Sequence, residues 1–216
     1  MNDWLQLDSG ANTPAYNMAL DEALLENAAT LGQPVLRFYD WSEPCATFGY
    51  SQKITQIETA TQLRPLIRRC TGGGLVPHDG DWTYSLIFPP DHEWTELAAT
   101  ESYQRTHKLL QAAFKEIGVE TDLAKSCRRP KPGECFEGNE LHDLLWNSKK
   151  VSGAAQRRNR YGLLIQGSVQ PADDWSKQDW RDFLSQGCSQ LEDIPDARAH
   201  ELTKAKYSRA EFNRKR

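Results

Sequence analysis

The spacing of apolar residues predicts helices and strands in mixed order along most of the chain. Apolar residues recur at three- and four-residue steps over 15–25, directly after the capping sequence Asn12-Thr13-Pro14, and again over 103–117. Both segments are therefore predicted to be helical. Shorter helices are expected over 54–63 and 174–184. Runs of β-branched and aromatic residues predict strands at 35–39, 45–50, 82–88, 119–123, 141–146, 150–155 and 161–169.

This order of elements predicts an α+β fold, because helices alternate with segments that are typical of antiparallel hairpins. The glycine-rich stretch 72–74 and the strand 82–88 are expected to form one such hairpin-like unit. No linker-like segment divides the chain, so residues 1–216 are expected to form a single domain. Within that domain, the last ~25 residues are expected to be a polar tail.

Composition and charge exclude several classes of protein. A net charge of −4 gives no overall basic field, so no nucleic-acid partner is expected. No apolar run approaches the roughly 20 residues of a membrane span, and the first five residues lack the cationic start and apolar core of a secretion signal. The cysteines number five, with no C-x-x-C pair, which favours a reducing cytoplasm over a disulfide framework or a zinc site.

The segment 67–79 is the first candidate for chemistry. Arg68 and Arg69 precede the three glycines 72–74, and His78-Asp79 follows them. Consecutive N–H groups in a glycine loop can cradle an anion or a polarised carbonyl, and arginine adds forked donors for a carboxylate or phosphate. The spacing matches neither the phosphate loop nor the dinucleotide fingerprint. A tight hairpin with a solvated charged entry is the alternative, but such a turn needs no flanking arginines or histidine. The segment is therefore predicted to bind a ligand.

A cysteine in a long polar loop is the second candidate. Cys135 lies in the loop 124–140 among several arginines and lysines, and neighbouring cations stabilise a thiolate. Long loops in compact domains are often functional. Taken alone, an ordinary loop cysteine remains the simpler interpretation, and Cys127 is the main rival. Cys45 and Cys70 lie in or beside predicted strands and are expected to be buried.

A lysine followed by small residues is the third candidate. Lys150 begins the run Val151-Ser152-Gly153-Ala154-Ala155. A lysine at a strand start can steady an oxyanion or a carboxylate, and the small residues would let a substrate chain lie against the backbone. A surface turn with basic ends is the alternative if the segment is considered alone.

Taken together, and in this order, the segments resemble the lipoate–protein ligase and octanoyltransferase family. The resemblance covers residues from about 12 to 170. The blocks that carry it are 17–22, 36–41 with 49–52, 68–79, 150–157 and 167–169. One departure concerns Ile165 and Gln166, because the family commonly has a histidine near these positions.

The resemblance implies a mixed, largely antiparallel sheet flanked by helices, like the catalytic domain of biotin and lipoate protein ligases. It also implies a tunnel for an acyl chain of medium length. The residues that it assigns to the acyl group are Arg69, Thr71, Gly72, Gly73, Gly74, Leu75, Val76, Pro77, His78, Gly153, Ala154, Ala155, Gly167 and Ser168.

Within the family, Cys135-Phe136 is similar to the Cys-Phe pair of the cysteine-dependent octanoyltransferases. This implies that the Cys135 thiolate takes an octanoyl group from acyl carrier protein as a thioester. A lysine of a lipoyl domain, in a 2-oxoacid dehydrogenase or the glycine cleavage H protein, then accepts it as an amide. Lys150 would stabilise the reacting carbonyl and lower the pKa of Cys135. This route needs no cofactor or metal.

The carrier domains are acidic, so a set of arginines is expected to receive them: Arg68, Arg69, Arg128, Arg129, Arg157 and Arg158. A cytoplasmic monomer is expected. The first alternative is an ATP-dependent lipoate–protein ligase, which would use ATP and magnesium and need a further domain or partner subunit. Chain length favours the transferase. A lipoyl-relay amidotransferase using the same cysteine, and a non-catalytic protein that binds carrier domains, also stay open.

Overall fold

Two β-sheets form the frame of the protein. The computed structural model describes residues 3–128 and 138–215. Its strands are β1 (Leu5–Asn12), β2 (Val35–Trp41), β3 (Cys45–Phe48), β4 (Leu66–Arg68), β5 (Val76–His78), β6 (Trp82–Phe88), β7 (Asp122–Leu123), β8 (Leu144–Trp146), β9 (Lys149–Asn159), β10 (Gly162–Val169) and β11 (Ser189–Gln190). The large sheet has the order β11-β1-β2-β6-β10-β9-β8-β7, and the small sheet has the order β4-β3-β5.

The large sheet is mixed but largely antiparallel. β1 runs parallel to β2 and β11, whereas every pair from β2 through β6, β10, β9 and β8 to β7 is antiparallel. This confirms the predicted α+β fold. The helical elements are α1 (Pro14–Leu31), α2 (Ile54–Ala60), α3 (Glu93–Glu96), α4 (Ala99–Glu116), α5 (Lys177–Ser185), α6 (Asp196–Leu202), the π-helix η1 (Thr203–Tyr207) and α7 (Ala210–Asn213).

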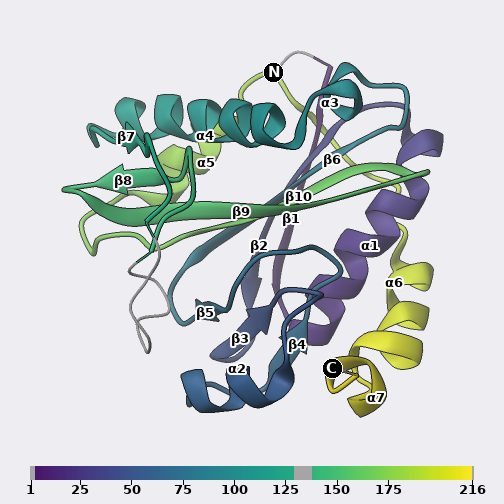
Figure 1. The fold of residues 1–216 in the computed structure, drawn as a ribbon. Coiled ribbons are helices and arrows are strands. Elements are labelled where there is room, and N and C mark those ends of the chain that lie inside the picture. Colours follow the sequence, from purple (N-terminus) through teal and green to yellow (C-terminus); the bar gives the residue numbers. More distant parts are fainter. Residues whose placement is uncertain (1–2, 129–137, 216) are drawn as a thin grey trace.

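Helices cover both faces of the large sheet (Figure 1). Side chains of a strand point alternately to opposite faces. Val35 and Tyr39 of β2 accordingly pack in the cluster that contains α1 and α6, whereas Leu36 and Phe38 pack in the cluster that contains α4 and α5. In Figure 1 the small sheet and α2 lie below β9 and β10. The face of the large sheet that carries α1 is thus also the face that meets the small sheet.

Helix α1 is buried on nearly all sides, since it lies between the sheet and the C-terminal helices. The Thr13 side chain accepts a hydrogen bond from the N–H of Tyr16, Pro14 opens the first turn, and Gly32 ends the helix with φ +66°. The helix buries charged residues as well as apolar ones, including Asp21 and Glu22. In the part of the chain that the structure describes, no helix is both long and apolar enough to cross a membrane.

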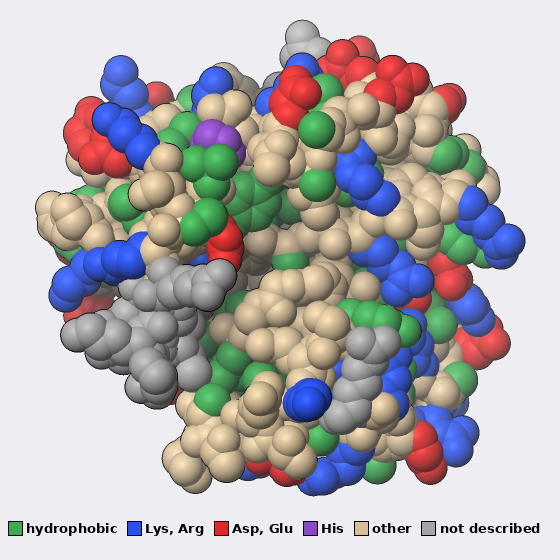
Figure 2. All heavy atoms as spheres, viewed as in Figure 1, with side chains coloured by type: hydrophobic (Ala, Val, Ile, Leu, Met, Phe, Trp, Pro, Cys, Tyr) green, Lys and Arg blue, Asp and Glu red, His purple; other side chains and the backbone are tan. Residues whose placement is uncertain are grey.

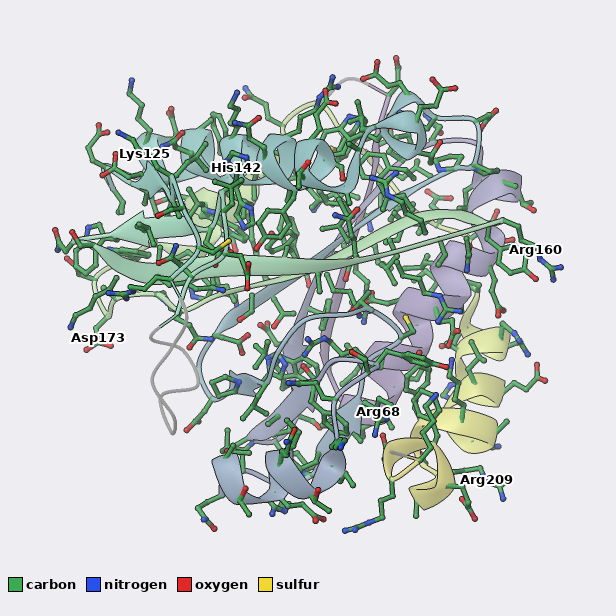
Figure 3. All side chains as sticks on the ribbon, in the orientation of Figure 1. Arg68, Lys125, His142, Arg160, Asp173 and Arg209 are labelled. Carbon is green, nitrogen blue, oxygen red and sulfur yellow. The ribbon has the colours of Figure 1, made fainter. Side chains whose placement is uncertain are left out.

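The C-terminal segment differs from the polar tail that the sequence predicts. α6, η1 and α7 fold against α1, and Leu202 and Tyr207 are buried. Arg68 fixes the end of the segment, because its guanidinium donates to the carbonyl oxygens of Phe212 at 3.2 Å and Asn213 at 3.0 Å. Figure 3 shows Arg68 beside these helices. The prediction is wrong because it rested on the polar composition of the segment, whereas a few buried apolar residues are enough to anchor it.

One further expectation fails, and one strand was missed. The glycine loop and strand 82–88 do not form a hairpin, since β5 pairs with β3 in the small sheet while β6 pairs with β2 and β10. β1 was not predicted, although Leu5 and Leu7 alternate with polar residues. A local sequence pattern predicts whether a segment is a helix or a strand. It does not predict which strands pair, because pairing depends on segments that are distant in sequence.

Candidate active site

A cavity of about 220 Å³ lies between the two sheets. The large sheet contributes residues of β2, β6, β9 and β10, and the small sheet contributes residues of β3, β5 and the glycine loop between β4 and β5. The face drawn in Figure 2 is hollowed near its centre, and green hydrophobic surface is visible within the hollow. The segment after β7 supplies Arg128, Gly138, Asn139 and Glu140, and α1 supplies Met18.

The structure brings most of the sequence-predicted site residues to this cavity. Those that line it are Arg69, Gly73, Gly74, Leu75, Val76, His78, Lys150, Gly153, Ala154, Ala155, Gly167 and Ser168. Thr71 and Gly72 of the glycine loop and Pro77 of β5 are not among the residues that line the cavity. Cys135 lies outside the described residues, as do Arg129 and Phe136.

Arg69 shapes the glycine loop from inside. Its Nη2 donates to the carbonyl oxygens of Gly72 at 3.0 Å and Gly74 at 2.9 Å, and its Nη1 donates to the Thr47 hydroxyl at 2.8 Å. The loop is also seated closely on Gly49, where an added Cβ would lie 2.0 Å from the Gly73 carbonyl oxygen. Side chain and backbone together fix the course of the loop.

The expectation that Arg68 and Arg69 receive acidic carrier domains is wrong. The Arg68 side chain is 0% exposed and Arg69 is only 5% exposed. Arg68 is engaged by carbonyl oxygens of α7 and of Tyr50 and Gln52. Both arginines therefore hold parts of the protein together and present no charge to a docking domain. Arg69 still lines the cavity.

A buried polar network holds the cavity side of β10. Arg37 and Asp21 form an ion pair at 2.6 Å, and both side chains are 0% exposed. Asp21 also accepts a hydrogen bond from Nε2 of Gln166 at 2.6 Å, and Oε1 of Gln166 accepts one from the Thr71 hydroxyl at 2.7 Å. Burial raises the pKa of Tyr39, whose hydroxyl donates to Asp21. Gln166, near the place of the family's histidine, is thus fixed in orientation.

His78 is held by two neighbours and a stacked ring. Its Nδ1 lies 2.8 Å from Asp81, its Nε2 lies 2.8 Å from the Thr47 hydroxyl, and the Trp41 ring stacks on it at 4.0 Å between centroids. Its partner is Asp81, not the exposed Asp79 that follows it in sequence. The Ser168 hydroxyl donates to Asp81 as well, at 2.6 Å. The group is therefore not a nucleophilic triad, in which the serine would contact the histidine.

Lys150 lies at the cavity with a carboxylate partner. Its Nζ is 2.7 Å from Oδ2 of Asp143; the lysine side chain is 18% exposed and the aspartate is 0% exposed. The ammonium therefore stands at the edge of the cavity, where a developing negative charge on a bound carbonyl would be attracted to it. No group of three or more His, Cys, Asp or Glu side chains within residues 3–128 and 138–215 is arranged to hold a metal ion.

The described ends of the segment around Cys135 meet at the cavity. Arg128 and Asn139 pair as an antiparallel bridge, with N–O distances of 2.7 and 2.9 Å, and both residues line the cavity. Cys127 is exposed, and its Sγ lies 3.2 Å from a Glu140 oxygen. Burial raises the pKa of Cys70 to about 11 and raises that of Cys45 further. These two thiols are therefore protonated at neutral pH.

Sequence reasoning missed several lining residues: Met18, Thr47, Thr83, Gly138, Asn139, Glu140 and Gln166. For Gln166 a signal existed. It is the polar residue in a strand of buried apolar ones, and the alternation of β10 places it on the same face as Ser168. Of the tryptophans, Trp41 lines the cavity, whereas Trp82 of β6 and Trp180 of α5 pack in the core between the large sheet and α4.

Comparisons with known proteins identify the family of the chain and agree with its fold. The family model of the lipoyl protein ligase A/B catalytic domain matches residues 13–177. The octanoyltransferase LipM of Halalkalibacterium halodurans is 33% identical over 182 residues, which are 78% of this chain and 66% of that protein. The chain spans 64 to 66% of the length of the curated relatives that it matches first.

Two solved structures share the fold. The Thermoplasma acidophilum protein Ta0514 with bound lipoic acid superposes with a TM-score of 0.79 at 21% identity, over 100% of both chains. Lipoate-protein ligase A bound with ATP superposes with a TM-score of 0.75 at 20% identity, over 99% of this chain and 98% of that one. The matched family model covers the cavity residues from Met18 to Ser168, and the chain belongs to the lipoyl protein ligase A/B catalytic-domain family.

Proposed function

We propose that the protein is an acyltransferase of protein lipoylation. It takes an octanoyl or lipoyl group from acyl carrier protein and passes it to a lysine of a lipoyl domain. The octanoyltransferase name of the relatives at 33% identity supports this reaction. The acceptor is a lipoyl domain of a 2-oxoacid dehydrogenase or the glycine cleavage H protein.

The observation that carries the proposal is the placement of Lys150 at the edge of a cavity between the two sheets. An engineered cavity of about 150 Å³ holds benzene, so the volume of about 220 Å³ has room for a medium-length acyl chain. The small residues Gly153, Ala154 and Ala155 of β9 form part of the wall, and they leave space for such a chain against the backbone.

The nucleophile in this proposal is Cys135. Cys135 itself lies outside the described residues. Support comes from Arg128 and Gly138, the nearest described residues on either side of it, because both line the cavity. Of the other cysteines, Cys45 and Cys70 are buried, and Cys127 is the alternative nucleophile that the experiments must separate from Cys135.

The proposed reaction has two steps. The Cys135 thiolate attacks the thioester carbonyl of the acyl carrier, a new S–C bond forms, and the carrier thiolate leaves and takes up a proton. The ε-amine of the acceptor lysine then attacks the enzyme thioester, an amide bond forms, the amine loses a proton and the Cys135 thiolate is released. Lys150 and loop N–H groups stabilise the oxyanion in both steps.

The test is an acyl-transfer assay with purified lipoyl domain as acceptor. One reaction contains octanoyl–acyl carrier protein and no ATP; a second contains free octanoate or lipoate with ATP and magnesium. The proposal predicts an acylated lipoyl domain in the first reaction, dependent on Cys135 and not on Cys127. Product only in the second reaction would instead identify an ATP-dependent ligase. Product in neither would favour a carrier-binding role and contradict the proposal.

A further inference from the structure

Lys150 is one end of a chain of hydrogen bonds that runs behind the cavity wall. Its Nζ contacts Oδ2 of Asp143 at 2.7 Å. The Tyr103 hydroxyl of α4 donates to the other carboxylate oxygen, Oδ1. The N–H of Ala154 in turn donates to the Tyr103 hydroxyl oxygen at 3.1 Å. Both ends of this chain, Lys150 and Ala154, line the cavity, so it links the cation to the backbone of the wall.

The carboxylate at the centre of the chain has no contact with solvent. Asp143 is 0% exposed. Besides Lys150 and Tyr103 it accepts a hydrogen bond from the N–H of Glu140 at 2.7 Å. A buried carboxylate is stable only when it is paired and hydrogen-bonded. Three donors from three separate segments therefore fix Asp143, and Asp143 in turn limits where the Lys150 ammonium can lie.

Two features of β9 allow this chain of hydrogen bonds. β8 pairs with β9 only as far as Ser152, so the N–H of Ala154 lies beyond the paired region and takes Tyr103 as its partner. At Gly153 an added Cβ would lie 2.7 Å from both Cε and Nζ of Lys150 and 3.1 Å from Oδ1 of Asp143. A Cβ at this position would therefore displace the end of the Lys150 side chain from its place across β9.

His107, which packs against Tyr103, does not compete with Lys150 for Asp143. His107 packs edge-on against Tyr103 at 4.4 Å between centroids, and its Nδ1 donates to the Tyr103 carbonyl oxygen at 3.1 Å. It is fully buried, and burial lowers its pKa to about 4. The imidazole is therefore neutral near pH 7, and Lys150 is the cation that pairs with the carboxylate.

We propose that Asp143 and Tyr103 are positioning residues that hold the Lys150 ammonium at the reacting carbonyl, across Gly153. This inference rests on the proposed acyl transfer for its catalytic meaning, but its structural content is independent of it. Asp143 is fully buried and Tyr103 acts through Asp143, so neither residue is expected to touch the carrier protein.

Two measurements on Asp143→Asn, Tyr103→Phe and Gly153→Ala test the inference. The first is single-turnover formation of the octanoyl-enzyme at saturating donor. A misplaced reacting group costs about 100-fold in rate, which is expected for Asp143→Asn and Gly153→Ala; about tenfold is expected for Tyr103→Phe, which removes one hydrogen bond to a charged group. For Asp143→Asn and Tyr103→Phe the donor concentration for half-saturation should not change, whereas general structural damage would alter it. Gly153→Ala is compared by rate alone, because Gly153 also lines the cavity.

The second measurement needs no enzymatic activity. Reductive methylation of the folded protein, mapped by peptide mass spectrometry, reports how accessible and reactive the Lys150 amine is. We expect faster labelling of Lys150 in Asp143→Asn and Tyr103→Phe than in the unmodified protein. The matched control is Tyr16→Phe, which removes a tyrosine–aspartate hydrogen bond to Asp196 outside the cavity lining. It should leave both measurements unchanged.

The outcomes separate the two proposals. If the unmodified protein forms no octanoyl-enzyme but Lys150 labelling responds as expected, the transferase proposal fails and the positioning of Lys150 stands. If octanoyl-enzyme forms and folded Tyr103→Phe and Gly153→Ala form it at the unmodified rate, the positioning inference is overturned. If Asp143→Asn fails to fold, which the loss of a buried ion pair makes conceivable, the other two variants still decide.

Discussion

Nη2 of Arg69 donates to the carbonyl oxygen of Gly74 at 2.9 Å, so the arginine that precedes the glycine loop also closes it. The same nitrogen holds the Gly72 carbonyl oxygen, and Nη1 holds the Thr47 hydroxyl. The loop therefore owes its shape to a side chain beneath it as much as to its glycines. The guanidinium N–H groups of Arg69, which the sequence predicts to bind a ligand, donate to backbone carbonyl oxygens of the protein.

We expect Arg69→Met to destabilise the protein, because it leaves two carbonyl oxygens and a hydroxyl without their donor. A hydrogen bond to a charged group contributes about 1.5–3 kcal/mol to stability, and less where the acceptor also meets water, as at the exposed Gly74. The matched control is Arg64→Met, since Arg64 is exposed and also donates to nearby carbonyl oxygens; its effect should stay within about 0.5 kcal/mol. Urea unfolding measures both. Equal stability of the two variants would contradict the bracing role of Arg69.

Gly49→Ala should also destabilise the loop. The new Cβ would lie 2.0 Å from the Gly73 carbonyl oxygen and 2.9 Å from that of Gly72, so backbone must move, at a typical cost of 1–3 kcal/mol. Gly72→Ala is the control for stability, because a Cβ there meets nothing within 4 Å. Thermal unfolding of the pair measures the difference. A Gly49→Ala protein as stable as Gly72→Ala would show that the loop does not rest on Gly49.

The loop illustrates which features the sequence can predict. Consecutive glycines between charged residues form a local pattern that predicts a ligand-binding loop at 72–74, and Gly73 and Gly74 line the cavity. The partners of that loop were not predicted, since Gly49 and Thr47 lie about 20 residues away in sequence and only the pairing of β3 with β5 brings them close. His78 was singled out in sequence, where Asp79 follows it; the fold gives it Asp81 as its partner.

The same limit applies to Lys150. Its run of small residues was recognised, and the reason for Gly153 was given as space for a substrate. The structure adds that Gly153 makes room for the lysine itself. Asp143 carried no signal in sequence, because an aspartate in a turn-rich segment is usually exposed; its burial follows from Tyr103, which α4 places over the end of β8.

His107 should make stability depend on pH. Its pKa is lowered from 6.5 to about 4, chiefly by burial, with Asp143 opposing and Lys150 and His142 adding to the shift. Between pH 6.5 and 4 the unfolded chain binds a proton that the folded protein does not, so the free energy of unfolding falls as pH falls through this window. The shift corresponds to about 3 kcal/mol at most.

We therefore expect His107→Asn to lose less stability than the unmodified protein when urea unfolding is compared at pH 7 and pH 4.5. Asparagine can still donate to the Tyr103 carbonyl oxygen but takes up no proton. His200→Asn is the control, because His200 is exposed. If the free energy of unfolding fell equally between pH 7 and pH 4.5 for His107→Asn and the unmodified protein, His107 would not be the group responsible.

Lys150→Met should slow formation of the octanoyl-enzyme by roughly 10²–10³-fold, the usual effect of losing one group that stabilises an oxyanion. The carrier should still bind, since the cavity wall remains. Lys177→Met is the matched control, because Lys177 also pairs with an aspartate, Asp40, but lies outside the cavity lining. Single-turnover rates distinguish them. A Lys150→Met rate within about threefold of the control would exclude the lysine from the chemistry.

The central claim is the thioester on Cys135, and intact mass after incubation with octanoyl–acyl carrier protein, without ATP, tests it most directly. The account predicts a single octanoyl adduct that hydroxylamine removes, that maps to Cys135, and that is absent from Cys135→Ser but present in Cys127→Ser. An adduct that persists in Cys135→Ser, or transfer to the lipoyl domain without any adduct on Cys135, would contradict it.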